Sequence, residues 1–270
     1  MTKVNTKTGR FFKKFLIFAV FALVLVGVFK LGKLSNNTKE AEIKEDTKSQ
    51  TNTSGEVRIP KALDQVIDDE SGDFKINFQY PVLENIGTET VTNQINTSVL
   101  KEAHLIIDNF KKDAEPNPSL PGDMSLDADY KFAGVNHGLV SIEFQVSEFL
   151  PGAAHPNNYS TTLLYKASDG SKINSIGNIC ANQNACLSRI VPIAQKYLKT
   201  ELKRLGAEYD ESAQTGSAVN IENYRDFVFK NEGLQIIYDS CQVAPCVYGT
   251  VYITIPWGEL TSILKSEYLK

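Results

Sequence analysis

The sequence predicts an α+β protein with antiparallel sheets, two main helices and a short C-terminal helix, preceded by a single transmembrane helix. In residues 58–270, segments with apolar and polar residues in alternation outnumber the segments with helical spacing, and the helices separate groups of strands. Near the N-terminus, residues 15–29 form an apolar run without a charge. We therefore expect a membrane segment followed by one folded domain.

The N-terminal apolar run is short for a membrane span and also fits the core of a cleaved signal peptide. No small-residue cleavage pattern follows Phe29, and lysines flank the run on both sides. Neighbouring apolar residues lengthen the hydrophobic segment, and flanking lysines can extend their charged ends to the membrane surface, so the segment can span a bilayer. We interpret residues 15–34 as an uncleaved transmembrane signal anchor that follows a short cytoplasmic tail, residues 1–14.

Residues 35–57 are rich in Lys, Glu, Thr, Ser and Asn and cannot bury a core, so we expect a flexible polar stalk. Residues 58–270 then hold 18 basic and 27 acidic side chains, a net charge of −9. This balance disfavours nucleic acid as a partner and would steer cationic ligands at low salt. Solubility alone is the other explanation of the acidic surface.

All four cysteines lie in the C-terminal half, as Cys180 with Cys186 and Cys241 with Cys246. Both spacings can close small disulfide loops, which suit an oxidising compartment, whereas free thiols and cross-pairing remain alternatives. A structural zinc site usually has two cysteines separated by only two residues, or histidines close by in the sequence. We therefore expect a single-pass protein of the cell membrane with its ectodomain outside the cytoplasm.

The first part of the ectodomain combines strands with one helix. Residues 73–80 alternate as a half-buried strand does, and residues 89–112 place apolar side chains at helical spacing. Strands over 125–133, 138–150 and 158–166 then suggest an antiparallel meander.

The second part repeats the order of helix and strands. A second amphipathic helix is expected over 187–205, and a short helix closes the chain at 258–265. We place the two halves at about 70–135 and 136–268. The strands expected between the helices cover 225–230, 234–239 and 247–255.

Two motifs carry a resemblance to a known family. A small-residue turn, Gly152 to His155, stands between two strands, and a late segment reads Gln-Val-Ala-Pro between Cys241 and Cys246 before an Ile-Pro-Trp strand end at Trp257. The chain resembles the extracytoplasmic domain family shared by the anti-sigma factor RsiV, which senses lysozyme, and the peptidoglycan deacetylase PdaC. In those relatives tyrosines stand at the positions of both late cysteines.

The resemblance implies an envelope domain that binds or senses a lysozyme-like protein or a cell-wall glycan. The tail of residues 1–14 is too short for the sigma-binding region of the anti-sigma relatives, so no sigma factor is expected as a partner. A separate deacetylase domain is not expected either. A structural scaffold for envelope proteins and an unrecognised hydrolase are the alternative functions.

The residues themselves do not indicate catalysis. The chain has only three histidines, His104, His137 and His155, and none stands at a metal-ligand spacing. No nucleophile elbow, phosphate loop or dinucleotide fingerprint occurs. We expect no enzyme activity, no catalytic residue, no metal and no cofactor.

Four residues are candidate ligand contacts: His155, Asn157, Tyr159 and Trp257. His155 follows small residues in a loop and is approachable, but its imidazole is equally suited to hold the turn by bonding to neighbouring backbone. Trp257 can anchor a partner or pack in the core against the last helix.

Overall fold

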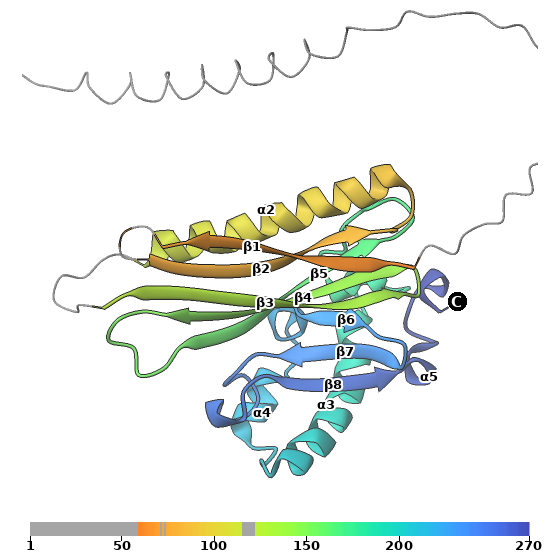
Figure 1. Ribbon diagram of the computed structural model, residues 1–270. Helices are drawn as coiled ribbons and strands as arrows, with labels where there is room; N and C mark the ends of the chain where they lie inside the picture. Colours follow the sequence, from red (N-terminus) through yellow and green to blue (C-terminus); the bar gives the residue numbers. More distant parts are fainter. Residues whose placement is uncertain (1–58, 71, 73, 115–121, 270) are drawn as a thin grey trace, which may run out of the picture. The chain divides into compact units, whose positions relative to one another are not determined.

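The computed structural model describes residues 59–70, 72, 74–114 and 122–269, all within one compact unit, Glu56–Lys270. The expected tail, anchor and stalk lie outside the described residues. Within the described part, no helix is both long enough and apolar enough to cross a membrane. Helices and two separate sheets make up this unit, which confirms the α+β class (Figure 1).

The first sheet has five strands in the order β1-β2-β3-β4-β5. Four of them confirm the expected strands at similar bounds. The first strand was not expected, because most of its residues are exposed and no buried face imposes an alternating pattern. The strands are β1 Lys61–Asp69, β2 Phe74–Glu84, β3 Met124–Asn136, β4 Leu139–Phe149 and β5 Asn157–Lys166.

Helix α2, Glu89–Asp113, confirms the helix expected at 89–112. Thr88 caps its start, since the Thr88 hydroxyl accepts the backbone N–H of Val91 at 3.3 Å. The helix packs against β2 and returns the chain to the same end of the sheet, so β2 and β3 pair in parallel. The expectation of purely antiparallel sheets is wrong at this pair, and the sheet is mixed.

The second sheet is antiparallel and has three strands, β6 Phe227–Phe229, β7 Gly233–Tyr238 and β8 Val251–Pro256. Helix α3, Cys186–Leu205, packs against β8 and confirms the second main helix. Shorter helical segments connect these elements. They are η2 Ile176–Ile179, α4 Glu211–Gly216, η3 Ile221–Tyr224, η4 Cys246–Tyr248, α5 Trp257–Leu260 and η5 Ser266–Tyr268.

Two bounds near the C-terminus differ from the expectation. Strand β8 begins at Val251 and not at 247, because η4 occupies the residues after the disulfide. The final helix is only Trp257–Leu260, because the chain continues as a turn and Leu264 then forms a β-bridge with Cys180. Backbone pairing with a distant segment therefore replaces the last turns of the expected helix.

The two sheets form one packed domain. One core is built from α2 and the first sheet, and the other from α3 and the second sheet, with Leu139 and Leu164 of the first sheet contributing to the second core. Strand β6 contacts β3, β4 and β5 and is the strand of its sheet nearest to them (Figure 1). The Asn136 side chain donates to the Phe229 carbonyl across this contact at 3.0 Å.

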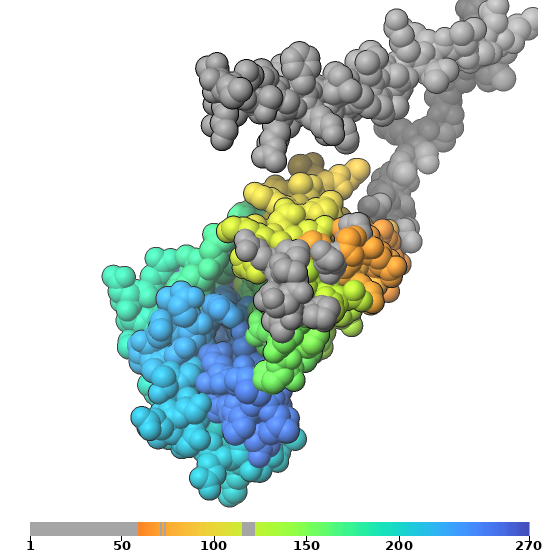
Figure 2. All heavy atoms as spheres, turned by 90° about the vertical axis from the view of Figure 1, so that its left-hand side faces the viewer, coloured from red at the N-terminus to blue at the C-terminus, as the bar shows by residue number. Residues whose placement is uncertain are grey.

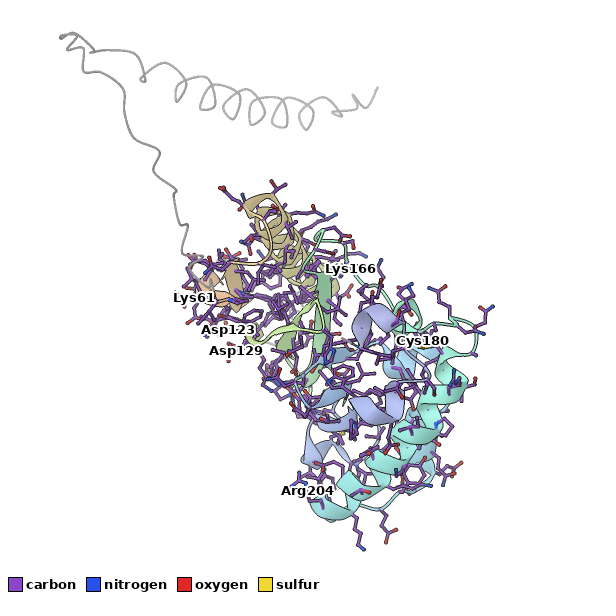
Figure 3. All side chains as sticks on the ribbon, turned by 90° about the vertical axis from the view of Figure 1, so that its right-hand side faces the viewer. Lys61, Asp123, Asp129, Lys166, Cys180 and Arg204 are labelled. Atoms are coloured by element: carbon purple, nitrogen blue, oxygen red, sulfur yellow. A yellow bond between two sulfur atoms is a disulfide. The ribbon has the colours of Figure 1, made fainter. Side chains whose placement is uncertain are left out.

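Both local disulfides form, so the free-thiol and cross-paired alternatives are not realised. Cys180 and Cys186 are each 1% exposed and join the end of η2 to the first residue of α3. Figure 3 shows Cys180 in the same half of the domain as α3. Cys241 and Cys246 are exposed and close a surface loop between β7 and β8.

Candidate ligand-binding site

Two loops that are distant in sequence enclose a surface hollow of about 280 Å³. One is the β4–β5 loop, and the other, here called the disulfide loop, comprises residues 240–247. Among the described residues, no Asp, Glu, Lys or Arg lines the hollow, and its one aromatic ring is the imidazole of His155. Its lining residues are His155, Pro156, Asn157, Asn158, Ser240, Cys241, Cys246 and Val247.

The inner side of the disulfide loop is anchored to the domain. Gln242 accepts the backbone N–H of Asp239 at 3.0 Å and donates to the carbonyl of Gly216 at 2.9 Å. The next two side chains, Val243 and Ala244, are buried in the core of the second sheet. This half of the loop therefore has little freedom to move.

The outer side of the disulfide loop faces solvent. Cys241 adopts a left-handed backbone with a φ of 70°, which non-glycine residues seldom adopt, and its disulfide to Cys246 closes the loop. Val247, next to the disulfide, is 88% exposed. The loop thus presents an apolar side chain and two sulfur atoms from a fixed base.

The β4–β5 loop and the first residue of β5 bring two of the four candidate contacts to the hollow, His155 and Asn157, both exposed. The Nδ1–H of His155 donates to the Pro156 carbonyl at 2.9 Å, so the imidazole holds the turn. A bond from the imidazole to neighbouring backbone is what the structural role of His155 would require. It leaves the Nε2 atom of His155 as the ring nitrogen available to a ligand.

Tyr159 lies in a neighbouring groove of about 390 Å³ along the outer edge of β5. Its hydroxyl donates to Glu148 at 2.6 Å, and burial together with that carboxylate raises the pKa of Tyr159. The Tyr159 hydroxyl is therefore already bonded within the domain. It does not join His155 in the lining of the hollow.

Charged residues close the edge of β5 in this groove. Asp239 accepts the backbone N–H of Ser160 at 2.7 Å, and Asp226 accepts that of Thr162 at 2.9 Å. Arg225 bonds to both carboxylates. Burial raises the pKa of Asp226 to about 6 despite the guanidinium beside it. These groups satisfy one another and act as a structural clasp.

Trp257 lies in an aromatic cluster at the end of β8. Its ring centroid is 4.3 Å from that of His137 and 5.0 Å from that of Phe229. The indole N–H donates to the carbonyls of Lys230 and Asn231. Trp257 lines neither the hollow nor the groove, and its contacts match core packing.

A buried carboxylate that the sequence did not single out joins the two sheets. Glu143 on β4 is 2% exposed and accepts the hydroxyl of Tyr252 on β8 at 2.7 Å. Ser160 on β5 also donates to it, at 3.3 Å. No sequence signal marked Glu143, because it stands at a polar position of the alternating strand β4, as Ser141 and Gln145 do, and its partners are far away along the chain.

Comparison with family models gives two consecutive matches. Residues 67–158 match a model described as deacetylase PdaC, and residues 178–258 match a protein family of unknown function, DUF3298. The first match contains the β4–β5 loop and the first two residues of β5, and the second contains the disulfide loop. The hollow therefore lies where the two matched regions meet.

Two characterised bacterial proteins are similar to this chain. The peptidoglycan-N-acetylmuramic acid deacetylase PdaC of Bacillus subtilis is 25% identical over 256 residues, which are 94% of this chain and 50% of the relative. The anti-sigma-V factor RsiV of the same species is 22% identical over 221 residues, 78% of this chain and 73% of the relative. The chain thus spans about half the length of PdaC.

Two crystal structures share the fold. A DUF3298 family protein from Pseudomonas aeruginosa superposes with a TM-score of 0.55 at 16% identity, over 77% of this chain and 95% of the other. A second member, from Bacteroides fragilis, gives a TM-score of 0.51 at 15% identity, over 77% and 93%. At such identities the likeness concerns the fold alone.

Proposed function

From the premise that the chain belongs to the domain family shared by PdaC and RsiV, we propose an extracytoplasmic binding or sensing domain of the cell envelope. Residues 58–270 form this domain, and residues 15–34 hold it at the membrane. The name of one relative refers to peptidoglycan and that of the other to an anti-sigma factor. Two disulfides support a domain that resides in an oxidising compartment.

The observation that carries the proposal is the hollow between the β4–β5 loop and the disulfide loop. In the chain-entropy picture a disulfide that closes so short a loop stabilises the fold by about 2 kcal/mol. A second effect acts on binding, because a loop fixed in one conformation loses less entropy when a ligand orders it. The anchored base and exposed tip of the disulfide loop fit this second role.

The lining of the hollow favours a protein ligand. Small-molecule pockets are usually lined by apolar and aromatic side chains, whereas this hollow offers amides, a hydroxyl, one imidazole and the exposed Val247. A domain with a net charge of −9 also attracts a basic protein. We therefore place a lysozyme-like protein first and a peptidoglycan fragment second.

A titration tests the proposal. The purified full chain, with its disulfides intact, is titrated with a lysozyme and separately with soluble peptidoglycan fragments, at low and at high salt. Saturable lysozyme binding that weakens several-fold at high salt is the expected result, because screening reduces the attraction between unlike charges. Absence of saturable binding to either ligand would overturn the proposal and favour the scaffold alternative.

A further inference from the structure

The two outer edges of the five-stranded sheet differ in whether other groups bond to their outward backbone N–H and carbonyl groups. Along β5, carboxylates accept the outward N–H groups of Ser160 and Thr162. Farther along, the backbone N–H of Lys166 donates to the Ser171 carbonyl at 2.9 Å, and Tyr165 forms a β-bridge with Lys172. An exposed strand edge invites pairing with another chain, and these contacts block it. The β5 edge is thus protected.

The opposite edge is formed by β1. Pro81 of β2 lies opposite Asp64 and has no N–H to donate, so this pair is not hydrogen-bonded. Leu83 lies opposite Ala62. Its N–H donates to the Asn96 side-chain oxygen, and its carbonyl accepts the Asn96 side-chain amide. Because the register is unbroken, alternate residues of β1 direct their backbone groups away from β2. They are Ala62, Asp64, Val66 and Asp68.

No protecting contact covers this edge in the described part of the chain. The contact found there is local, from the Gln65 side chain to the Asp64 carbonyl at 2.8 Å. The acidic side chains of β1 do not cover this edge either, since Asp64 accepts the Tyr130 hydroxyl and Asp68 accepts the side-chain amide of Asn77. The orange β1 segment lies at the surface in Figure 2, and Lys61 lies at the margin of the domain in Figure 3.

Exposed apolar side chains lie on the same edge strand as the unpaired backbone groups of β1. Leu63 and Val66 on β1 are 45% and 48% exposed, and Ile59, just before the strand, is 67% exposed. A nine-residue edge strand with such side chains is what a pairing surface requires. We propose that β1 pairs antiparallel with β1 of a second copy of this chain.

The sequence of β1 fits one self-paired register. With Gln65 opposite its own copy, Leu63 lies opposite Ile67, so an apolar pair forms twice. Lys61 lies opposite Asp69, which also bonds to Lys111 of its own domain at 2.6 Å, so Lys61 joins an existing ion pair. Every outward N–H and carbonyl of the strand then finds a partner. Cross-strand pairs of these kinds stabilise a sheet by about 0.2–1 kcal/mol each.

The neighbouring registers that keep the same hydrogen-bonding pattern are worse. A shift in one direction places Asp64 opposite its own copy and Asp68 opposite Pro60, which has no N–H. A shift in the other direction places Asp64 opposite Asp68 twice. Like charges directly opposite each other destabilise a sheet. The pairing about Gln65 is therefore the register that the proposal specifies.

Cysteine cross-linking tests the register in the full chain, solubilised in detergent. Gln65→Cys puts two thiols at a non-hydrogen-bonded pair, where Cα atoms lie about 4.5 Å apart. We expect a disulfide-linked dimer under mild oxidation, at least fivefold more than for the matched control Leu63→Cys, whose copies lie far apart in this register. Equal cross-linking at both positions, or none at Gln65→Cys, would overturn the proposal.

Sedimentation provides an independent measurement. Val66→Pro removes one outward N–H, which β2 does not use, so the monomer should keep its fold and its melting temperature within a few degrees. We expect the dimer dissociation constant to rise at least tenfold, with Val66→Thr, which keeps the N–H, close to wild type. A wild-type chain that stays monomeric, or a Val66→Pro dimer as tight as wild type, would overturn the pairing.

Salt separates this interaction from ligand binding. Two domains of net charge −9 repel each other, so dimerisation should strengthen as salt is added. Binding of a basic protein at the hollow should weaken under the same change. A dimer that weakens with salt would contradict the β1 pairing and leave the proposed ligand binding unaffected.

Discussion

Asp226 accepts the backbone N–H of Thr162 at 2.9 Å, so a side chain that precedes β6 completes the edge of β5 in the other sheet. The same carboxylate accepts the Thr162 hydroxyl at 3.2 Å and bonds to Arg225. This clasp connects the two sheets along β5, in the groove next to the hollow.

Asp226 is expected to make stability depend on pH. Burial raises its pKa to about 6 from the ordinary value of 3.8, so the folded state binds the proton more tightly than the unfolded state. The stability from this group is complete below about pH 4 and is lost as the pH rises through 6. The loss is at most about 3 kcal/mol.

Asp226→Asn removes that titration. Between pH 4 and 7, the free energy of unfolding of the variant should therefore improve relative to wild type by up to about 3 kcal/mol. Urea unfolding of both proteins across this range measures the difference. A difference that stays constant with pH would show that Asp226 does not titrate as described.

Glu143 and Tyr252 should be energetically coupled across the two sheets. Glu143→Leu and Tyr252→Phe each remove a buried hydrogen bond and should destabilise the fold by about 1–3 kcal/mol. The double variant should lose less than the sum of the two, with a coupling of about 1 kcal/mol or more. Tyr248→Phe, whose hydroxyl bond to the Gly206 carbonyl is exposed, is the matched control and should change stability by less than about 0.5 kcal/mol. Additive effects at Glu143 and Tyr252 would refute the coupling.

The two disulfides should differ in their reactivity toward thiols. Cys241 and Cys246 are exposed, whereas Cys180 and Cys186 are buried, and attack on a disulfide needs access to a sulfur atom. During stepwise addition of a reductant to the folded protein, alkylation followed by mass spectrometry should label the first pair well before the second. Simultaneous labelling would contradict the difference in access.

Gly216 is expected to be essential for the disulfide loop. A Cβ atom at Gly216 would lie 1.9 Å from the carbonyl oxygen of Gln242, so Gly216→Ala must displace the anchored side of the loop. We expect a loss of at least about 2 kcal/mol in the free energy of unfolding. Gly258→Ala is the control, because no atom of the described residues outside its own stretch of chain lies within 4 Å of the added methyl group. Equal stability of both variants would argue against a tight anchor.

Local patterns predicted much of the fold. Helices α2 and α3 followed from apolar spacing, and β4 from its alternation of apolar and polar residues. Strand β1 was missed because no face of it is continuously buried. The parallel pairing of β2 with β3 was missed because alternation reports which face is buried and carries no information on the direction of the neighbouring strand.

The candidate site was only partly predictable. Sequence motifs drew attention to His155 and to the late cysteines separately, but only the packing of the two sheets shows that they share a hollow. Asp226 and Glu143 acquire their roles from partners far away along the chain. A sequence pattern cannot distinguish such buried carboxylates from the solvated acidic residues around them.

Binding of lysozyme to loop variants of the full chain tests the central claim most directly. Val247→Arg adds a bulky charge at the rim of the hollow, while Leu105→Arg adds the same charge at a 48% exposed position on α2, outside its lining. We expect Val247→Arg to weaken binding at least tenfold, a change of about 1.4 kcal/mol, and Leu105→Arg to stay within about twofold of wild type. Equal affinities for the two variants would contradict ligand recognition at this hollow.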